Sequence, residues 1–292
     1  MIEMRTSRPE EVARQKEVWK LAFHDDDSFI DFYYDNYYKP DRVFVLEEDG
    51  EIKTMLATFP IRLYLPDGSY AVSAYFYALG TDPKDRKNGY GRRLFGYAEE
   101  YLQANGVDCA TLVPSEPSMF RYFDTIGYEK SFSHRKVEVT RKLLPQLPET
   151  GSIQPAAPSR YNRIRDNILN GAFYVAYPDE LIQHQKGISR LANADIYELE
   201  VDGVCGVAAA EYLDDDNLLL KELVIPAEQM AQAVALVARE LPALRYFVRF
   251  PTFLGEVPGC YVQTFGVVKW FNEELEQKWG RDTHGYLGLA FD

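Results

Sequence analysis

The chain has 292 residues, of which 46% are hydrophobic and 26% charged, and its formal net charge at pH 7 is −13. This length and composition predict a globular protein of one large domain or two ordinary ones, with a sizeable core. The negative charge argues against a nucleic-acid partner, because a polyanion would be repelled. It favours a cationic small-molecule partner such as an amine, or it serves solubility alone.

A membrane-spanning or secreted protein is not expected. The sequence holds no apolar run close to the ~20 residues that a membrane helix needs. Its start, Met1–Arg5, lacks the apolar stretch of a signal peptide. The cysteines and histidines are scattered, without the spacing of a disulfide framework or a metal site. We therefore expect a cytoplasmic protein with no membrane partner and no metal.

The first half of the chain alternates patterns typical of strands and helices. Strands are predicted near 2–4 and over 42–47, 52–64, 69–81, 107–113 and 132–139, and helices from residue 9, over 29–38, over 90–104 and over 118–125. The helix over 90–104 carries one apolar stripe, and Asn105–Gly106 supplies its stop. This order predicts a mixed α/β unit.

A proline-rich segment separates the two halves. Four prolines and one glycine stand between Leu144 and Pro158, which excludes a continuous helix or a central strand. We predict a first domain over 1–142, a linker over 143–160 and a second domain over 161–292. The second half repeats the order more loosely, with strands over 196–201, 204–212, 218–225, 244–250 and 286–291 and a helix over 227–240. The fold class is therefore predicted to be α/β, with a mixed sheet in two similar units.

The segment after the strand 69–81 carries the clearest chemical signal. It joins a strand to a helix through a polar loop with two glycines, Gly89 and Gly91, which let the backbone approach a ligand closely. The start of a helix offers free N–H groups and a partial positive charge, and that combination binds phosphates. The dinucleotide pattern fails because Leu94 takes the place of its third glycine. Four cations also gather here in an acidic chain: Arg86, Lys87, Arg92 and Arg93.

This segment resembles the signature of the GNAT acetyltransferase superfamily. Arg86-x-x-Gly89-x-Gly91 matches the family's pattern, and Leu79–Pro83 matches the lead-in of the strand before it. Further on, Tyr122–Tyr128 is similar to another family segment, so that the resemblance covers 42–139. It implies that acetyl-CoA is the cofactor and that this loop holds its pyrophosphate, with the acetyl carbonyl near the N–H of Leu79 or Gly80. The residues implied to bind it are Leu79, Gly80, Thr81, Arg86, Lys87, Asn88, Gly89, Tyr90, Gly91 and Arg92.

The catalytic residues implied by the resemblance are less well matched. The family often has a tyrosine four residues before the glycine that is Gly127 here, where it protonates the leaving thiolate, but Phe123 holds that position. Tyr122 replaces it through a shift, another group acts, or no acid is needed, since a thiol has a pKa of about 8.5 and leaves tolerably well. Candidate bases for the amine are Glu116 and the C-terminal carboxylate of Asp292.

The candidate Asp292 follows an apolar end, Gly285–Phe291, which suggests a buried terminus. Some tandem GNAT enzymes, among them the aminoglycoside acetyltransferases of the enhanced-intracellular-survival type, use a C-terminal carboxylate as base. Those enzymes carry a third, sterol-carrier-like domain that this chain is too short to include, so the analogy is partial.

The second half resembles a GNAT unit that has lost its cofactor site. Its helix begins Pro226-Ala227-Glu228-Gln229, without the two glycines and with an acidic first turn, which does not suit a pyrophosphate. The arrangement is thus two tandem GNAT-like units, the first with the cofactor site. The aromatic residues Tyr246, Phe250 and Trp270 either close the acceptor pocket or pack in the core.

The function predicted on this basis is an acetyl-CoA-dependent N-acetyltransferase that modifies a small, cationic amine by direct attack. The absence of the usual tyrosine keeps an alternative open, a non-catalytic regulatory protein that binds acyl-CoA. A purely structural or interaction protein is the third hypothesis. The sequence does not identify the acceptor amine.

Overall fold

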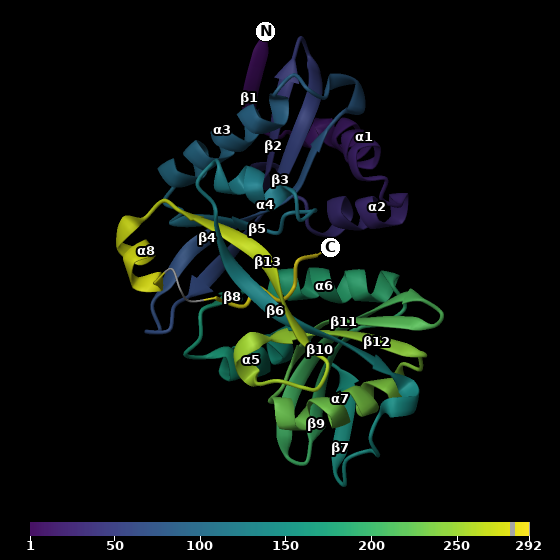
Figure 1. Cartoon of the computed structure of the whole chain (residues 1–292). Helices are drawn as coiled ribbons and strands as arrows, with labels where there is room; N and C mark the ends of the chain where they lie inside the picture. The colour runs from purple at the N-terminus through teal and green to yellow at the C-terminus, as the bar shows by residue number, and fades with distance from the viewer. Residues whose placement is uncertain (281–283, 292) are drawn as a thin grey trace. The chain divides into compact units, whose positions relative to one another are not determined.

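The computed structural model describes residues 1–280 and 284–291, and the chain divides into two compact units. Unit 1 comprises Met1–Ile61, Ala71–Leu112 and Val268–Leu275, and unit 2 comprises Arg62–Tyr70, Val113–Val267 and Glu276–Asp292. Figure 1 shows the elements along the chain. Each unit is built from three separate segments of the chain, whereas each predicted domain is one continuous segment. The division into two units therefore does not test the predicted domain boundaries, and the linker over 143–160 stays a prediction.

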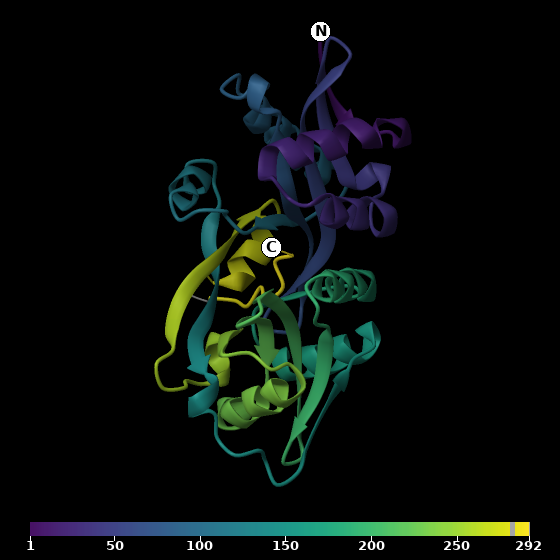
Figure 2. The same ribbon diagram turned by 90° about the vertical axis from the view of Figure 1, so that its right-hand side faces the viewer.

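Unit 1 contains a mixed sheet between helices. Its elements are β1 (Ile2–Thr6), η1 (Pro9–Glu11), α1 (Val12–Phe23), α2 (Asp27–Asn36), η2 (Pro40–Arg42), β2 (Val43–Glu48), β3 (Glu51–Tyr64), β4 (Tyr70–Thr81), η3 (Pro83–Asp85), α3 (Tyr90–Ala104) and β5 (Cys109–Leu112). The strand order is β1-β2-β3-β4-β5, in which β1–β2 and β2–β3 are antiparallel and β4–β5 is parallel. Helices α1 and α2 cover one face of these strands and α3 covers the other (Figures 1 and 2).

Alternate side chains of β4 face the two helical layers of unit 1, as the strand period requires. Phe76 packs against Phe95 of α3, with ring centroids 4.7 Å apart. Its neighbour Tyr77 points the other way and contacts Trp19 of α1 at 5.6 Å. Because both faces are covered, half of the 12 residues of β4 are buried, and α3 packs beside this strand.

Unit 2 also contains mixed β-strands between helices. Its elements are α4 (Met119–Asp124), β6 (Glu129–Thr140), η4 (Arg141–Leu143), β7 (Gly151–Pro155), α5 (Pro158–Leu169), β8 (Tyr174–Ala176), α6 (Asp179–Leu191), β9 (Ile196–Val201), β10 (Val204–Asp214), β11 (Asn217–Val224), α7 (Ala227–Glu240), β12 (Arg245–Pro251), η5 (Thr252–Leu254), β13 (Tyr261–Trp270) and α8 (Glu273–Trp279). Strand β13 and helix α8 also contribute residues to unit 1, and β3 and β4 of unit 1 contribute residues to unit 2.

The strand order in unit 2 is β6-β12-β11-β10-β9-β7. Of these neighbouring pairs, β11–β12 is parallel and the other four are antiparallel. Figure 2 shows α5 and α6 on one face of these strands and α7 on the other. The β11–α7–β12 connection repeats the β4–α3–β5 connection of unit 1, since each joins parallel neighbours through one helix. Each unit therefore contains the same β-α-β module.

The predicted mixed α/β class is confirmed, and the helices over 90–104 and 227–240 begin and end as expected. Helices α5 and α6, strands β7, β8 and β13 and helix α8 were not predicted. The prolines near 143–160 obscured α5, because Pro158 is the first residue of that helix, where proline is favoured. Tyr246 and Phe250 are fully buried in the core of unit 2, whereas Trp270 is half-buried.

The predicted last strand over 286–291 is wrong. Gly285 and Tyr286 each make one isolated bridge, to Phe132 and Tyr174, and the following residues are irregular. The expectation of a buried segment is nevertheless confirmed for 286–291, in which Tyr286, Leu287, Leu289, Ala290 and Phe291 are at most 1% exposed. Asp292 lies outside the described residues.

Candidate cofactor-binding site

The end of β4 separates from β5 at the beginning of the predicted site. The two strands are in register from Ser73–Cys109 to Tyr75–Thr111, and β5 ends at Leu112, whereas β4 continues to Thr81. Within this extension Ala78 has a φ of +50°, a conformation that costs a non-glycine residue about 1–2 kcal/mol. Such strain is typical of functional sites. The next residue, Leu79, is 37% exposed despite being apolar.

Gly80 and Thr81 fix this strand end against its neighbours. A Cβ at Gly80 would lie 3.1 Å from Cβ of Ala22 in α1, so only glycine fits without a shift. The hydroxyl of Thr54 donates to the carbonyl of Gly80 at 2.6 Å, and the hydroxyl of Thr81 donates to Oγ1 of Thr54 at 2.9 Å. Among residues 77 to 81 at this strand end, Leu79 is the only exposed one.

The loop that follows turns sharply into α3. Asp82 accepts a hydrogen bond from the backbone N–H of Lys84 at 3.1 Å, which starts η3. Lys87 and Gly89 then adopt left-handed backbone conformations, with φ of +70° and +77°. Gly89 is the N-cap of α3, and because it has no side chain, no cap covers the first-turn N–H groups of the helix.

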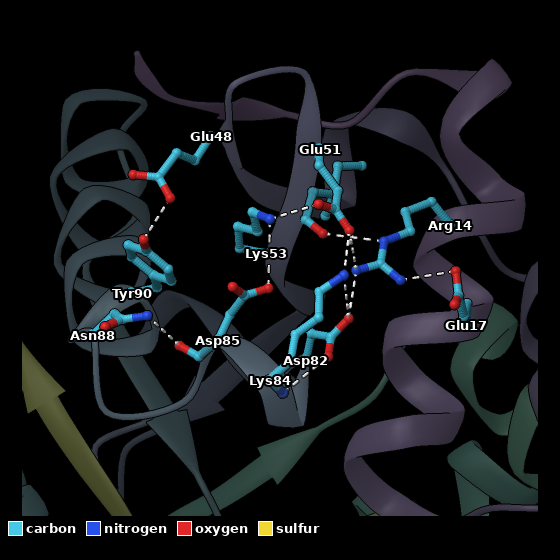
Figure 3. Close-up of polar contacts among 11 residues, drawn as sticks. Arg14, Glu17, Glu48, Glu51, Lys53, Asp82, Lys84, Asp85, Asn88 and Tyr90 are labelled. Atoms are coloured by element: carbon cyan, nitrogen blue, oxygen red, sulfur yellow. Dashed lines mark hydrogen bonds and ion pairs between the residues drawn. The ribbon is translucent and has the colours of Figure 1, made fainter.

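A network of ion pairs supports the loop from beneath (Figure 3). Arg14 of α1 lies 2.6 Å from Oδ2 of Asp82 and 3.3 Å from Oε1 of Glu51. Glu51 also pairs with Lys53 at 2.6 Å and Lys84 at 2.5 Å. The hydrogen bonds from Lys53 and then Lys84 lower the pKa of Glu51 to about 2. The loop is thus tied to α1 and β3 by charges that neutralise one another.

A second group of cations at the loop is not neutralised. Among the residues that the structure describes, Lys87, Arg92 and Arg93 have no carboxylate within 4.0 Å, and all three are exposed. Arg86 is held by a bond from Nη2 to the carbonyl of Ala22, at 3.3 Å. The surface of the loop is therefore positive in a chain with a net charge of −13. Unpaired cations beside uncapped helix N–H groups are suited to a phosphate-bearing ligand.

Tyr90 and Asn88 complete the predicted set of loop residues. The Tyr90 hydroxyl donates to Oε2 of Glu48 at 2.6 Å, a contact that raises the pKa of the phenol. The Asn88 side chain donates to the carbonyl of Asp85 at 3.2 Å, which closes the loop on itself. At Gly91, an added Cβ would meet Oγ1 of Thr81 at 3.5 Å, so the first turn of α3 lies directly over the end of β4.

Of the predicted catalytic residues, Tyr122 and Glu116 lie in unit 2, and the predicted cofactor loop lies in unit 1. Tyr122 of α4 is half-buried, while its neighbour Phe123 is buried and packs on Tyr128 with ring centroids 5.7 Å apart. Glu116 is exposed, and its carboxylate accepts a bond from Ser118 at 3.2 Å. Asp292 is outside the described residues.

Sequence reasoning missed the residues that support the loop. Arg14 and Asp82 stand 68 positions apart, and Lys84 and Glu51 stand 33 apart, so no local pattern links them. The strained Ala78 was missed as well, because alanine carries no sequence signal for a positive φ. Of the residues in these ion pairs, Asp82 alone belongs to a segment that the sequence analysis identified, the lead-in Leu79–Pro83.

The described residues contain no group of three or more potential metal ligands placed to hold a metal ion. In the same part of the chain, every helix is too short or too polar to cross a membrane.

Residues 3–130 match the family model described as "Acetyltransferase (GNAT) domain". The match contains β4, the loop and α3. No curated protein sequence gives a significant match to the chain.

Several solved structures share the fold. Eis1 from Mycobacterium abscessus is 16% identical over 94% of this chain and 75% of its own, with a TM-score of 0.68. A GCN5-related N-acetyltransferase from Kribbella flavida is 14% identical over 94% of this chain and 72% of its own, with a TM-score of 0.71. A putative acetyltransferase from Pyrococcus horikoshii is 13% identical over 98% of this chain and 94% of its own, with a TM-score of 0.60. At these identities the similarity establishes the fold alone.

The corresponding helix start in unit 2 differs from the start of α3. Helix α7 has Pro226 as its N-cap and Glu228 in its first turn, so its charge opposes a phosphate. The loop at Gly255 also lies on it, because a Cβ added there would be 2.6 Å from Cβ of Ala227. A covered, acidic helix start cannot accept a pyrophosphate in the manner of α3.

Proposed function

We propose that the chain is an acetyl-CoA-dependent N-acetyltransferase whose cofactor lies at the loop Arg86–Arg92. The observation that carries this proposal is the uncapped start of α3, which carries unpaired cations and lies over the end of β4. The GNAT domain assignment of residues 3–130 gives independent support.

The residues present fit coenzyme A. The N–H groups of Tyr90, Gly91 and Arg92 cannot find acceptors within their own helix, so they are suited to hold the pyrophosphate. Lys87 and Arg92 add positive charge on the exposed side of the loop. The extension of β4 beyond β5 offers the backbone of Leu79 and Thr81 to the pantetheine arm, in the manner of an added strand.

When bound, acetyl-CoA supplies an activated acetyl group as a thioester. The backbone N–H of Leu79 or Gly80 would stabilise negative charge on the carbonyl oxygen during attack by the amine. A carboxylate oxygen of Glu116 or of Asp292 would take a proton from the amine, and the Tyr122 hydroxyl would donate one to the thiolate. These three roles stay proposals, and the structure describes only two of the three side chains.

The acceptor proposed is a small, cationic amine in the cytoplasm, in line with the net charge of −13. We further propose that unit 2 derives from a second GNAT unit without a cofactor site. The repeated β-α-β module and the covered, acidic start of α7 support this tandem arrangement.

The test combines binding and turnover. Thermal unfolding is measured with and without coenzyme A and acetyl-CoA, and release of free thiol is then followed with polyamines, aminoglycosides, amino acids and N-terminal peptides. We expect stabilisation by both ligands and thiol release with at least one amine class. No stabilisation at millimolar coenzyme A would refute the proposal.

One observation favours the alternative of a non-catalytic acyl-CoA-binding protein. Phe123 occupies the position of the usual acid and is 7% exposed, packed on Tyr128, so it cannot donate a proton. Coenzyme A binding with no thiol release across the whole amine panel would support this alternative, whereas turnover with any amine would exclude it.

A further inference from the structure

The predicted cofactor loop combines an exposed, strained middle with a buried beginning. Residues 86–89 are all exposed, and Lys87 has a φ of +70°, which is unfavourable for a residue other than glycine. A strained conformation persists only where the surrounding structure determines it. At the beginning of the loop Asp82 is buried, with 4% of its surface exposed. The conformation of the loop therefore depends on how the chain is held at Asp82.

Asp82 fixes the direction of the chain through both its backbone and its side chain. Its N–H donates to the carbonyl of Lys53 in β3 at 3.0 Å, and its carbonyl accepts from the N–H of Asp85 at 2.9 Å. Oδ1 accepts from the N–H of Lys84 at 3.1 Å. Nζ of Lys84 is 3.6 Å from Oδ2, but this side chain is 56% exposed, so water screens its charge. A buried carboxylate needs a closer cation than this.

Arg14 of α1 supplies that cation and joins it to β3. Nη2 donates to Oδ2 of Asp82 at 2.6 Å and to Oε1 of Glu51 at 3.3 Å. Nε donates to the carbonyl of Ile52 at 3.2 Å, and Nη1 pairs with Glu17 of the same helix at 2.8 Å. Figure 3 shows the guanidinium between Glu17 on one side and Glu51 and Asp82 on the other. Arg14 thus connects the beginning of the loop to α1 and to β3 at a single point.

The stability of the folded chain is a weak explanation for this network. Glu51 and Lys84 are 42% and 56% exposed, and ion pairs with exposed members contribute little to stability because water screens their charges. The same contacts have a larger consequence for binding, since an ordered loop loses less conformational freedom when a ligand binds. The network is therefore better explained by the loop conformation that it holds.

We infer that Arg14 is a positioning residue for coenzyme A, which fixes Asp82 and through it the loop proposed to hold the pyrophosphate. This inference rests on the proposed function. Within the described chain, the hydrogen bonds and ion pairs of Arg14 all go to residues outside the predicted cofactor-binding set. The effect assigned to Arg14 is therefore indirect.

An alternative is that the charge of Arg14 attracts a phosphate directly, and Asp82→Asn separates the two possibilities. Removal of a carboxylate makes the surroundings of the loop more positive, so attraction by charge alone predicts tighter binding of coenzyme A. Loss of the anchor predicts weaker binding. Because Arg14 acts through Asp82, the double variant Arg14→Gln/Asp82→Asn should bind no more weakly than the weaker of the two single variants.

Arg5 provides a matched control in the same unit. Its guanidinium pairs with two carboxylates, those of Glu11 at 2.6 Å and Glu47 at 2.5 Å. Its side chain is 12% exposed, compared with 20% for Arg14. Arg5→Gln therefore removes an arginine of similar burial and pairing, and it leaves the contacts of Asp82 intact.

The test measures the Kd of coenzyme A by isothermal titration, KM for acetyl-CoA and kcat by thiol release, and stability by urea unfolding. We expect Arg14→Gln and Asp82→Asn each to raise the Kd at least fivefold, with KM rising in parallel. We expect kcat to stay within twofold of the wild type, because Thr54 and not Arg14 holds the strand end at Gly80. Arg5→Gln should lower the urea midpoint as Arg14→Gln does, but leave the Kd within twofold.

An unchanged Kd in Arg14→Gln, or tighter binding by Asp82→Asn, would overturn the inference. An equal rise of the Kd in Arg5→Gln would assign the effect to lost stability and would overturn it as well. A wild-type chain that does not bind coenzyme A contradicts the proposed function instead. Hydrogen exchange of the amides of residues 82–85 then decides the anchoring: exchange at least tenfold faster in Arg14→Gln than in Arg5→Gln would support it, and equal exchange would refute it.

Discussion

Replacement of Gly89 by glutamate tests the cofactor site at its most specific position. The chain offers a matched control in Gly106, because both glycines are exposed, have φ near +80° and have no atom within 4 Å of an added Cβ. They stand at opposite ends of α3, whose 15 residues span about 22 Å at 1.5 Å each. The same substitution thus imposes the same kind of backbone strain at two positions, one of which is at the proposed pyrophosphate.

The magnitudes follow from the two environments. A left-handed conformation costs an L-residue about 1–2 kcal/mol, so both Gly89→Glu and Gly106→Glu should lose roughly that much stability. In Gly89→Glu the new carboxylate lies at the positive end of the helix dipole, which should stabilise the variant by about 0.5 kcal/mol. For binding, a carboxylate ~6 Å from one phosphate charge repels it by about 0.7 kcal/mol in water and about 2.8 kcal/mol at an effective dielectric constant of 20. We therefore expect coenzyme A affinity to fall by about three- to hundredfold in Gly89→Glu only.

Isothermal titration with coenzyme A measures the affinities, and urea unfolding without ligand measures the stabilities. Gly106→Glu should bind coenzyme A as the wild type does, although it is destabilised. Equal affinity in Gly89→Glu and in the wild type would refute the placement of the pyrophosphate at this loop. Equal losses of affinity in the two variants would assign the effect to strain and not to the site.

Three further predictions concern pH and proton transfer. Burial, and to a smaller extent the charge of Lys221, lowers the pKa of His184 from 6.5 to about 3 in the folded chain. As pH falls below 6.5 the unfolded chain therefore binds a proton that the folded chain does not, and the folded state should lose about 2 kcal/mol of stability by pH 5. Urea unfolding at pH 8 and pH 5 measures this loss, which should be smaller in His184→Gln. Burial disfavours the ionised form of Asp82, but the hydrogen bond from Arg14 favours it, and the net effect lowers the pKa of this carboxyl. Asp82→Asn should therefore reduce the free energy of unfolding by about 1–2 kcal/mol at pH 7 and by nothing at a pH below that lowered pKa. The same urea unfolding curves measure both values. If Tyr122 is the acid, Tyr122→Phe should lower kcat about 10²-fold with the Kd of coenzyme A unchanged, and an unchanged kcat would indicate that the thiolate leaves unaided.

The loop and its flanking elements could be predicted from the sequence because their conformations are local. The glycines at 89 and 91, the cations around them and the apolar stripe of α3 all lie within a few residues of one another. The same is true of α7, whose period and first residues predicted both the helix and its lack of a cofactor site. The local signal at Pro158 did not predict α5, because proline marks a break in some segments and is a favoured first residue of a helix in others.

The sequence by itself predicted the β-α-β modules, the glycine loop and, at the start of α3, the glycines and cations that would suit a phosphate. Only the tertiary structure decided which cations remain available there, since the carboxylates that neutralise Arg14 and Lys84 come from distant positions in the chain. It also decided that the apolar chain end is not a strand, because Arg165 and Tyr177 bind carbonyls that a ladder would otherwise hold. The physical reason is the same in both cases: backbone conformation is largely set by neighbours in sequence, whereas the pairing of charges and of buried polar groups is set by neighbours in space.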